Sequence, residues 1–144
     1  MKQMKLALLF LSALALAGCT SFDPRQTLLF TDENGNVISV DYGRSKKDHE
    51  SKYTAPNGKV LTMKSPLAVR VTLPDGTDFI AWKCMNPLPL LKGTMYRSDN
   101  EKWMYHAYGT ACQVFQEAIN PEGKKDYLII FEGIVCEGPK KESL

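Results

Sequence analysis

Tight-turn sequences recur at short intervals along this chain, and their spacing limits the fold more than any other feature. Glycine follows Asn or Asp at Asn34-Gly35, Asn57-Gly58 and Asp75-Gly76, and such pairs are typical of hairpin turns. The segments between the turns are rich in β-branched and aromatic residues, and none of ten residues or more has the apolar spacing of a helix. The sequence therefore predicts an all-β fold, a small antiparallel barrel or sandwich of about eight strands.

The clearest strand is predicted at residues 67–73, where apolar and other side chains alternate with a period of two. The segment that follows the turn at Asp75-Gly76 continues this pattern, with Ile80, Trp82 and Cys84 on one face. Residues 85–92 contain two prolines and cannot form a central strand. Residues 43–52 are charged and lack apolar spacing, so we expect a solvated loop there.

The N-terminal segment has the three zones of an export signal. Lys2 and Lys5 precede an apolar run at residues 6–16, and small residues then lead to Cys19. The run is shorter than the roughly 20 residues that span a bilayer as a helix. The tetrapeptide Leu16-Ala17-Gly18-Cys19 resembles the lipobox of bacterial lipoproteins. That resemblance implies that the chain is cleaved before Cys19 and that lipid is attached to this cysteine.

These features divide the chain into a signal peptide at residues 1–18, a lipidated tether at 19–26 and a single β domain at 27–144. Two or three acyl chains hold a protein on a membrane almost permanently, because each buried CH₂ contributes about 0.8 kcal/mol. Thr20 follows the cysteine, and the absence of aspartate there favours the outer membrane in enterobacterial lipoproteins. We therefore expect a lipid-anchored envelope protein that faces the periplasm in a Gram-negative cell.

Charge and motifs exclude several classes of function. The signal peptide contains two of the 18 basic residues and none of the 16 acidic ones, so the mature chain is formally neutral. A neutral domain has no net field that would attract nucleic acid. The sequence contains no GxSxG, HExxH, P-loop or GxGxxG motif. We expect neither an enzyme nor a cofactor.

Three further cysteines lie in the predicted domain, Cys84, Cys112 and Cys136. One pair among them is expected to form a disulfide in an oxidising compartment, which would stabilise the fold by roughly 3–4 kcal/mol. The pairing stays open, and the third thiol is expected to be buried. No CxxC or HxxxH spacing is present, so we predict no metal site.

An aromatic segment near residues 92–108 is the strongest candidate for a binding surface. Aromatic side chains interleaved with charged ones are common at interface hot spots, although alternate rings in a barrel strand also fill its interior. The candidate partner-binding residues are Lys92, Tyr96, Lys102, Tyr105, His106 and Tyr108.

Residues 53–117 resemble the domain of the membrane-bound inhibitors of c-type lysozyme, small lipoproteins with an eight-stranded barrel. Residues 53–62 (YTAPNGKVLT) are similar to the opening strand of that family, and residues 69–77 (VRVTLPDGT) to its central hairpin. Residues 93–99 (GTMYRSD) are similar to its Ser-Ala-Ser-Gly-Ala-Arg-Tyr stretch, and residues 105–111 fall where its Trp-x-Lys-Gly motif lies.

The chain departs from this family at the positions that matter most for inhibition. The early cysteine of the family falls on Ala55, while Cys136 is near its late one. The inhibitory serine falls on Leu90 or Lys92, and the inhibitory lysine on Tyr108. In the family these two groups enter the lysozyme cleft and engage its catalytic carboxylates. Lys92 or Lys102 would have to supply the missing charge.

The sequence thus supports two hypotheses. The chain is either an envelope lipoprotein whose barrel binds a partner such as a lysozyme-like hydrolase, or a structural or assembly lipoprotein that contacts other envelope components without inhibiting an enzyme.

The anchor gives the first testable prediction. We expect cells that express the chain to incorporate labelled palmitate into it, and Cys19→Ala to abolish that incorporation because no other residue of the lipobox offers a thiol. Mass spectrometry of the native protein gives a second readout, and an unmodified mature N-terminus would contradict the prediction.

Overall fold

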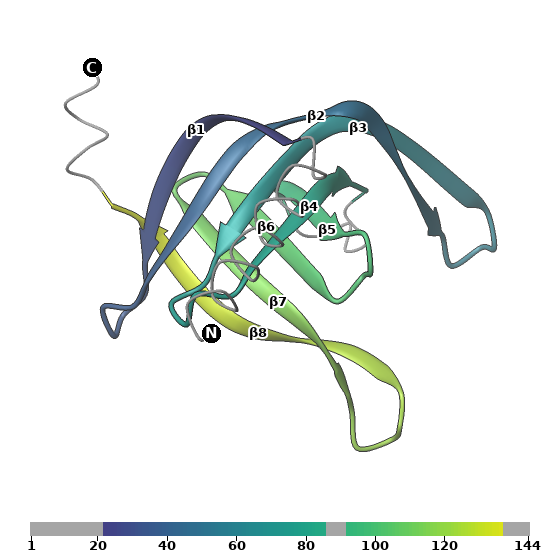
Figure 1. Cartoon of the computed structure of the whole chain (residues 1–144). Helices are drawn as coiled ribbons and strands as arrows, with labels where there is room; N and C mark the ends of the chain where they lie inside the picture. Colours follow the sequence, from purple (N-terminus) through teal and green to yellow (C-terminus); the bar gives the residue numbers. More distant parts are fainter. Residues whose placement is uncertain (1–21, 86–91, 137–144) are drawn as a thin grey trace, which may run out of the picture.

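The computed structural model describes residues 22–85 and 92–136 of the 144-residue chain. Eight antiparallel strands form one closed barrel in which each strand pairs with its neighbours in sequence and the last strand pairs with the first (Figure 1). The strands are β1 (Phe22–Thr31), β2 (Val37–Thr54), β3 (Val60–Thr72), β4 (Asp78–Cys84), β5 (Thr94–Ser98), β6 (Trp103–Tyr108), β7 (Ala111–Ile119) and β8 (Lys125–Val135). The all-β prediction is confirmed, and the architecture is a barrel.

The turns form where the sequence predicts them. Gly35, Gly58 and Gly76 follow the predicted Asn or Asp and have φ between 83° and 90°, a backbone region that favours glycine. Each turn is closed by backbone hydrogen bonds, such as Gly76 N to Leu73 O at 2.9 Å. Within the two described ranges, no helix is long and apolar enough to cross a membrane.

Two hairpins extend past the barrel, β2–β3 and β7–β8, and Figure 1 shows both. The expectation of a solvated loop at residues 43–52 is wrong, because all of these residues belong to β2. After an irregularity between Arg44 and His49, the strand pairs with β3 from His49 to Thr54. Most side chains of residues 44–52 are exposed or half-buried, so the backbone ladder forms without an apolar alternation.

The first strand also differs from its prediction, because β1 begins at Phe22. Residues 22–26, expected in the tether, therefore pair with β2, and the register shifts between Pro24 and Gln26. Proline is tolerated here because this part of β1 has no described partner on its other side.

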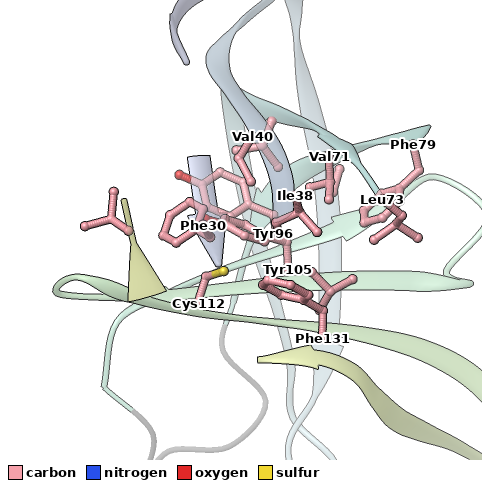
Figure 2. Close-up of a cluster of buried hydrophobic side chains, with 14 residues drawn as sticks. Phe30, Ile38, Val40, Val71, Leu73, Phe79, Tyr96, Tyr105, Cys112 and Phe131 are labelled. Carbon is pink, nitrogen blue, oxygen red and sulfur yellow. The ribbon is translucent and has the colours of Figure 1, made fainter. Parts of the chain in front are cut away.

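Inward-facing side chains from all eight strands fill the interior of the barrel (Figure 2). Its most buried large residues include Tyr105, Ile38, Val40, Val69, Val71 and Val114. A second cluster covers the outer wall, where Cys84, Met95 and Met104 pack with Phe115 and Tyr127. Strand β6 is therefore buried on both faces at Met104, Tyr105 and His106.

The barrel closes through a short pairing of β1 with β8, Phe30 with Val135 and Thr31 with Ile134. Gly133 lies beside this seam, and a Cβ atom there would be 2.4 Å from the carbonyl oxygen of Thr31. Only glycine allows the two backbones to approach so closely.

The core predicts the effect of truncating Ile38, which is 1% exposed, compared with its neighbour Val37, which is 45% exposed. We expect Ile38→Ala to lower the free energy of unfolding by about 2–5 kcal/mol, because it leaves a cavity in the barrel. Val37→Ala should cost less than about 1 kcal/mol. Urea denaturation of the two variants measures both values, and equal losses would contradict the inward orientation of Ile38.

Candidate functional site

The six residues predicted to bind a partner do not form one surface. Tyr96 and Tyr105 face the barrel interior, where their exposed fractions are 8% and 0% (Figure 2). Their ring centroids are 5.8 Å apart, and the Tyr105 hydroxyl bonds that of Tyr42 at 2.5 Å. The prediction that Tyr105 contacts a partner is wrong, because its position on β6 points into the core. Tyr96 is likewise part of the core and does not belong to an outer binding surface.

Lys92 and Tyr108 are exposed, and the structure brings them together around His106. The His106 Nε2 atom bonds the carbonyl oxygen of Lys92 at 2.6 Å. Gly93 follows with φ of 104°, and a Cβ atom there would be 3.0 Å from the Cβ of Tyr108. A side chain at position 93 would therefore separate the Lys92 segment from β6.

Lys102 is exposed but lies at the other end of β6, in the turn that precedes Trp103. Its carbonyl oxygen accepts a bond from the Glu117 amide at 2.8 Å. Six residues of extended strand separate it from Tyr108, which corresponds to about 20 Å. Lys102 therefore does not belong with Lys92, His106 and Tyr108.

A groove of about 570 Å³ runs along the outer wall beside His106. We call it the His106 groove. Its walls come from β6, β7, β8 and the turn after β1, and Tyr108 and Ile134 on it are 54% and 58% exposed. The lining residues are Thr31, Asp32, Glu33, His106, Tyr108, Ala111, Cys112, Gln113, Glu132, Gly133 and Ile134.

Three polar side chains form a row across the groove. His106 pairs with Gln113, and Gln113 pairs with Glu132, at successive positions of β6, β7 and β8. Directly opposite residues of paired strands share a face, so all three side chains lie on the outer wall. His106 Nδ1 is 3.2 Å from Gln113 Oε1, and Gln113 Nε2 donates to Glu132 Oε2 at 2.6 Å.

The partners of His106 decide which ring nitrogen carries a proton. The Lys92 carbonyl can only accept, so Nε2 of His106 donates to it. Nδ1 lies on the side of Gln113, whose amide in turn donates to Glu132.

The groove presents acidic groups beside apolar ones. Asp32 accepts bonds from the Asn34 amide, the Asn36 amide and the Asn36 side chain at 2.8–3.0 Å. The side-chain bond from Asn36, followed by the backbone bonds, holds the pKa of Asp32 below its usual value. Asp32 therefore stays ionised, and Glu33 and Glu132 lie on the same groove. Carboxylates next to Tyr108 and Ile134 match a basic side chain with an apolar stem.

Sequence reasoning missed Gln113, Glu132 and Ile134. Each lies on the outward face of β7 or β8, alternating with buried residues such as Val114 and Phe131. The alternation itself is visible in the sequence. Which outward residue of β7 faces His106 depends on the strand register, and no pattern within one strand specifies that.

The expected disulfide is not formed, because Cys84, Cys112 and Cys136 are all free. Cys112 is in the interior cluster, whereas Cys84 belongs to the outer cluster with Met95 and Met104. The barrel wall therefore keeps these two side chains on opposite faces of the sheet. Burial raises the pKa of Cys84 to about 11 and that of Cys112 to about 12. Among the residues that the structure describes, no group of three or more His, Cys, Asp or Glu could hold a metal ion.

The row predicts the protonation state of His106. We expect Nε2 to carry a proton at neutral pH because the Lys92 carbonyl accepts from it, and nitrogen chemical shifts of the imidazole measure this directly. In Gln113→Leu the Nε2 proton should remain while the Nδ1 shift changes, because only the Nδ1 partner is removed. An unprotonated Nε2 in the unmodified protein would contradict the arrangement.

Comparisons with known proteins give no match. No family model matches the chain, and neither does a curated protein or a solved structure. The His106 groove and the N-terminal segment are therefore the features that support a functional proposal.

Proposed function

We propose that this chain is a lipid-anchored protein of the bacterial cell envelope whose barrel binds a lysozyme-like hydrolase beside the His106 groove. The lipobox-like segment at residues 16–19 supports the anchor. The contact of Lys92 with His106, next to Tyr108, is the observation on which the binding surface depends.

This contact matters because of the two positions that the family resemblance matches to inhibitory residues. One is at Leu90 or Lys92 and the other is at Tyr108, and the Lys92 segment lies directly against Tyr108. Leu90 lies outside the described residues. Tyr108 has no charge, but Lys92 is exposed and its backbone lies against the end of β6, and we expect its ammonium group to supply the cation that a carboxylate-containing cleft would accept. Lys102 is about 20 Å away along β6 and cannot take this role.

Tyr108 and Ile134 add apolar area to the same surface. A tyrosine that is 54% exposed buries a large area on binding at a low entropic cost. The carboxylates of Asp32, Glu33 and Glu132 border this area and would pair with basic groups at the rim of the partner. The surface thus combines a protruding cation with an acidic groove.

A second candidate function is supported by the β7–β8 hairpin. Ile119, Leu128 and Ile129 on this hairpin are 53–66% exposed, and β8 has no described partner on its other edge from Lys125 to Gly133. Exposed apolar strand edges are sites where other chains add a strand. A structural or assembly role would use this hairpin and would leave Lys92 and Tyr108 without effect.

The inhibitor proposal is tested by adding the unlipidated domain, at micromolar concentration, to a c-type lysozyme in a lytic assay. We expect inhibition, and we expect Lys92→Ala and Tyr108→Ala each to raise the half-inhibitory concentration about tenfold or more, because central interface residues commonly contribute over 1 kcal/mol. Lys102→Ala is the matched control, since it removes the same charge at the far end of β6 and should change little.

No inhibition by the unmodified domain would remove the inhibitor proposal. In that case Leu128→Lys distinguishes the structural role, because a charge on the β8 edge should abolish crosslinking to an envelope component if that edge is the contact.

A further inference from the structure

The barrel has a second hollow, at one of its mouths, which the proposed function does not use. It has a volume of about 270 Å³ and opens at the mouth formed by the start of β1, the middle of β2 and the middle of β3. We call it the mouth cavity. Its lining residues are Arg25, Gln26, Tyr42, Gly43, Arg44, Leu67, Ala68 and Tyr96. Arg25 of this cavity and Thr31 of the His106 groove are six residues apart on β1, which corresponds to about 20 Å.

The side chains at this mouth point inward by register. Tyr42 pairs with Val69 and Gln26, and Arg44 pairs with Leu67 two residues further along both strands. Tyr42 and Val69 belong to the interior, and alternate residues of a strand share a face. Arg44 therefore lies on the inward side of β2 above Tyr42.

Two tyrosine side chains, Tyr42 and Tyr96, line the cavity. The Tyr42 hydroxyl shares a hydrogen bond of 2.5 Å with that of the buried Tyr105, and either oxygen can be the donor. Where Tyr105 donates, the proton of Tyr42 can point toward the cavity. Tyr96 is 8% exposed and lines the same cavity, so its hydroxyl can donate to a ligand there.

Burial keeps both hydroxyls protonated. It raises the pKa of Tyr42 to about 12 and raises that of Tyr96 above its ordinary value. Neither group can therefore become an anion near neutral pH, and both remain hydrogen-bond donors.

The rim adds two guanidinium groups. Arg44 is exposed and makes no ion pair within the part of the chain that the structure describes. Arg25 bonds Asp23 at 3.1 Å, but both side chains are more than 60% exposed, so this pair is solvated and weak. Asp23 does not line the cavity, and no carboxylate does. The polar side chains of the cavity are therefore two guanidinium groups, which only donate hydrogen bonds, two tyrosine hydroxyls, which can donate or accept, and the amide of Gln26.

We propose that the mouth cavity binds a small oxyanion, a carboxylate or phosphate group, between Arg44 and the hydroxyls of Tyr42 and Tyr96. Guanidinium groups bind carboxylate and phosphate oxygens in a bidentate manner, and the tyrosine hydroxyls can donate to the same oxygens. Leu67 and Ala68 form an apolar wall for the remainder of a small organic anion.

Chain connectivity suggests where such a group would come from. Phe22 pairs with Ser45, next to Arg44, and is three residues after Cys19. An extended chain spans at most about 3.5 Å per residue, so an acylated Cys19 lies within roughly 10 Å of Phe22. If the anchor proposed above is present, the mouth faces the phosphates of the bilayer, and a lipid headgroup is one source of the oxyanion. The other source is a free anion, and this alternative does not depend on the anchor.

The experiment uses the mature chain with Cys19→Ala, which carries no lipid, and titrates it with inorganic phosphate and with benzoate while NMR signals of Arg44, Tyr42 and Tyr96 are followed. We expect saturable shifts, and we expect Arg44→Gln and Tyr96→Phe each to weaken binding about tenfold, because each removes one hydrogen bond to a charged ligand. Lys47→Gln is the control, since it removes an exposed positive charge from the same strand outside the cavity.

A parallel arm measures cosedimentation of the same proteins with vesicles of phosphatidylglycerol and of phosphatidylcholine. Saturable binding of either free anion supports a soluble ligand, whereas binding only to phosphatidylglycerol that is lost in Arg44→Gln and Tyr96→Phe supports a headgroup. The absence of both, or an equal loss in Lys47→Gln, would overturn the proposal. Thermal unfolding confirms that each variant is folded, and lysozyme inhibition by the same proteins is scored separately.

Discussion

The seam between β1 and β8 is the constraint on which the rest of this structure depends. Two ladder pairs close the barrel there, Phe30 with Val135 and Thr31 with Ile134, and the Cys136 amide also bonds the Leu29 carbonyl. The approach requires glycine at position 133. The same seam brings Thr31 and Ile134 to the wall of the His106 groove. The same residue pairs therefore close the core and build one wall of the candidate site, and β8 from Lys125 to Gly133 has no described partner on its other edge.

Strand β6 restrains the site because it is packed on both faces. Tyr105 faces the interior and packs against Phe30, Tyr42 and Tyr96. Its neighbours Met104 and His106 face outward, yet both are buried, the first by the outer cluster and the second by the Lys92 carbonyl and Gln113. A strand fixed on both faces holds the His106 ring in one orientation. The exposed Tyr108 at its end is then presented from a fixed base, which lowers the entropy lost on binding.

The sequence predicted the fold better than the site, and the difference has a physical reason. Hairpins can be predicted from short segments, since an Asn-Gly or Asp-Gly turn and a period-two pattern involve only neighbouring residues. The strand at residues 43–52 is not predicted, because a hairpin that projects into solvent needs a backbone ladder but no apolar face. The sequence also predicts Tyr96 and Tyr105 on a binding surface, because an aromatic side chain suits a core and an interface equally well.

The row from His106 to Glu132 and the mouth cavity depend on register, which a single sequence does not specify. Gln113 and Glu132 are seven and 26 residues from His106, and only the pairing of β6, β7 and β8 aligns them. The cysteines illustrate the same limit. Counting thiols suggested a bridge, but Cys84 and Cys112 alternate onto opposite faces of the wall. The sequence of one strand shows which side chains share a face. Which of the two faces points into the barrel is decided by the partner strands.

The two hollows have opposite charge, so positive and negative groups of the neutral domain are separated in space. The mouth cavity offers guanidinium and hydroxyl donors, while the His106 groove offers three carboxylates. In the proposed anchored form, the mouth lies near Cys19 and the anionic bilayer. Attraction between Arg44 and lipid phosphates would then keep this end of the barrel at the membrane surface. The groove lies about 20 Å further along β1, so the carboxylates that the bilayer would repel are kept away from it. A domain with no net charge can thus be oriented by the distribution of its charges, with the carboxylates of the β1–β2 turn kept away from the membrane.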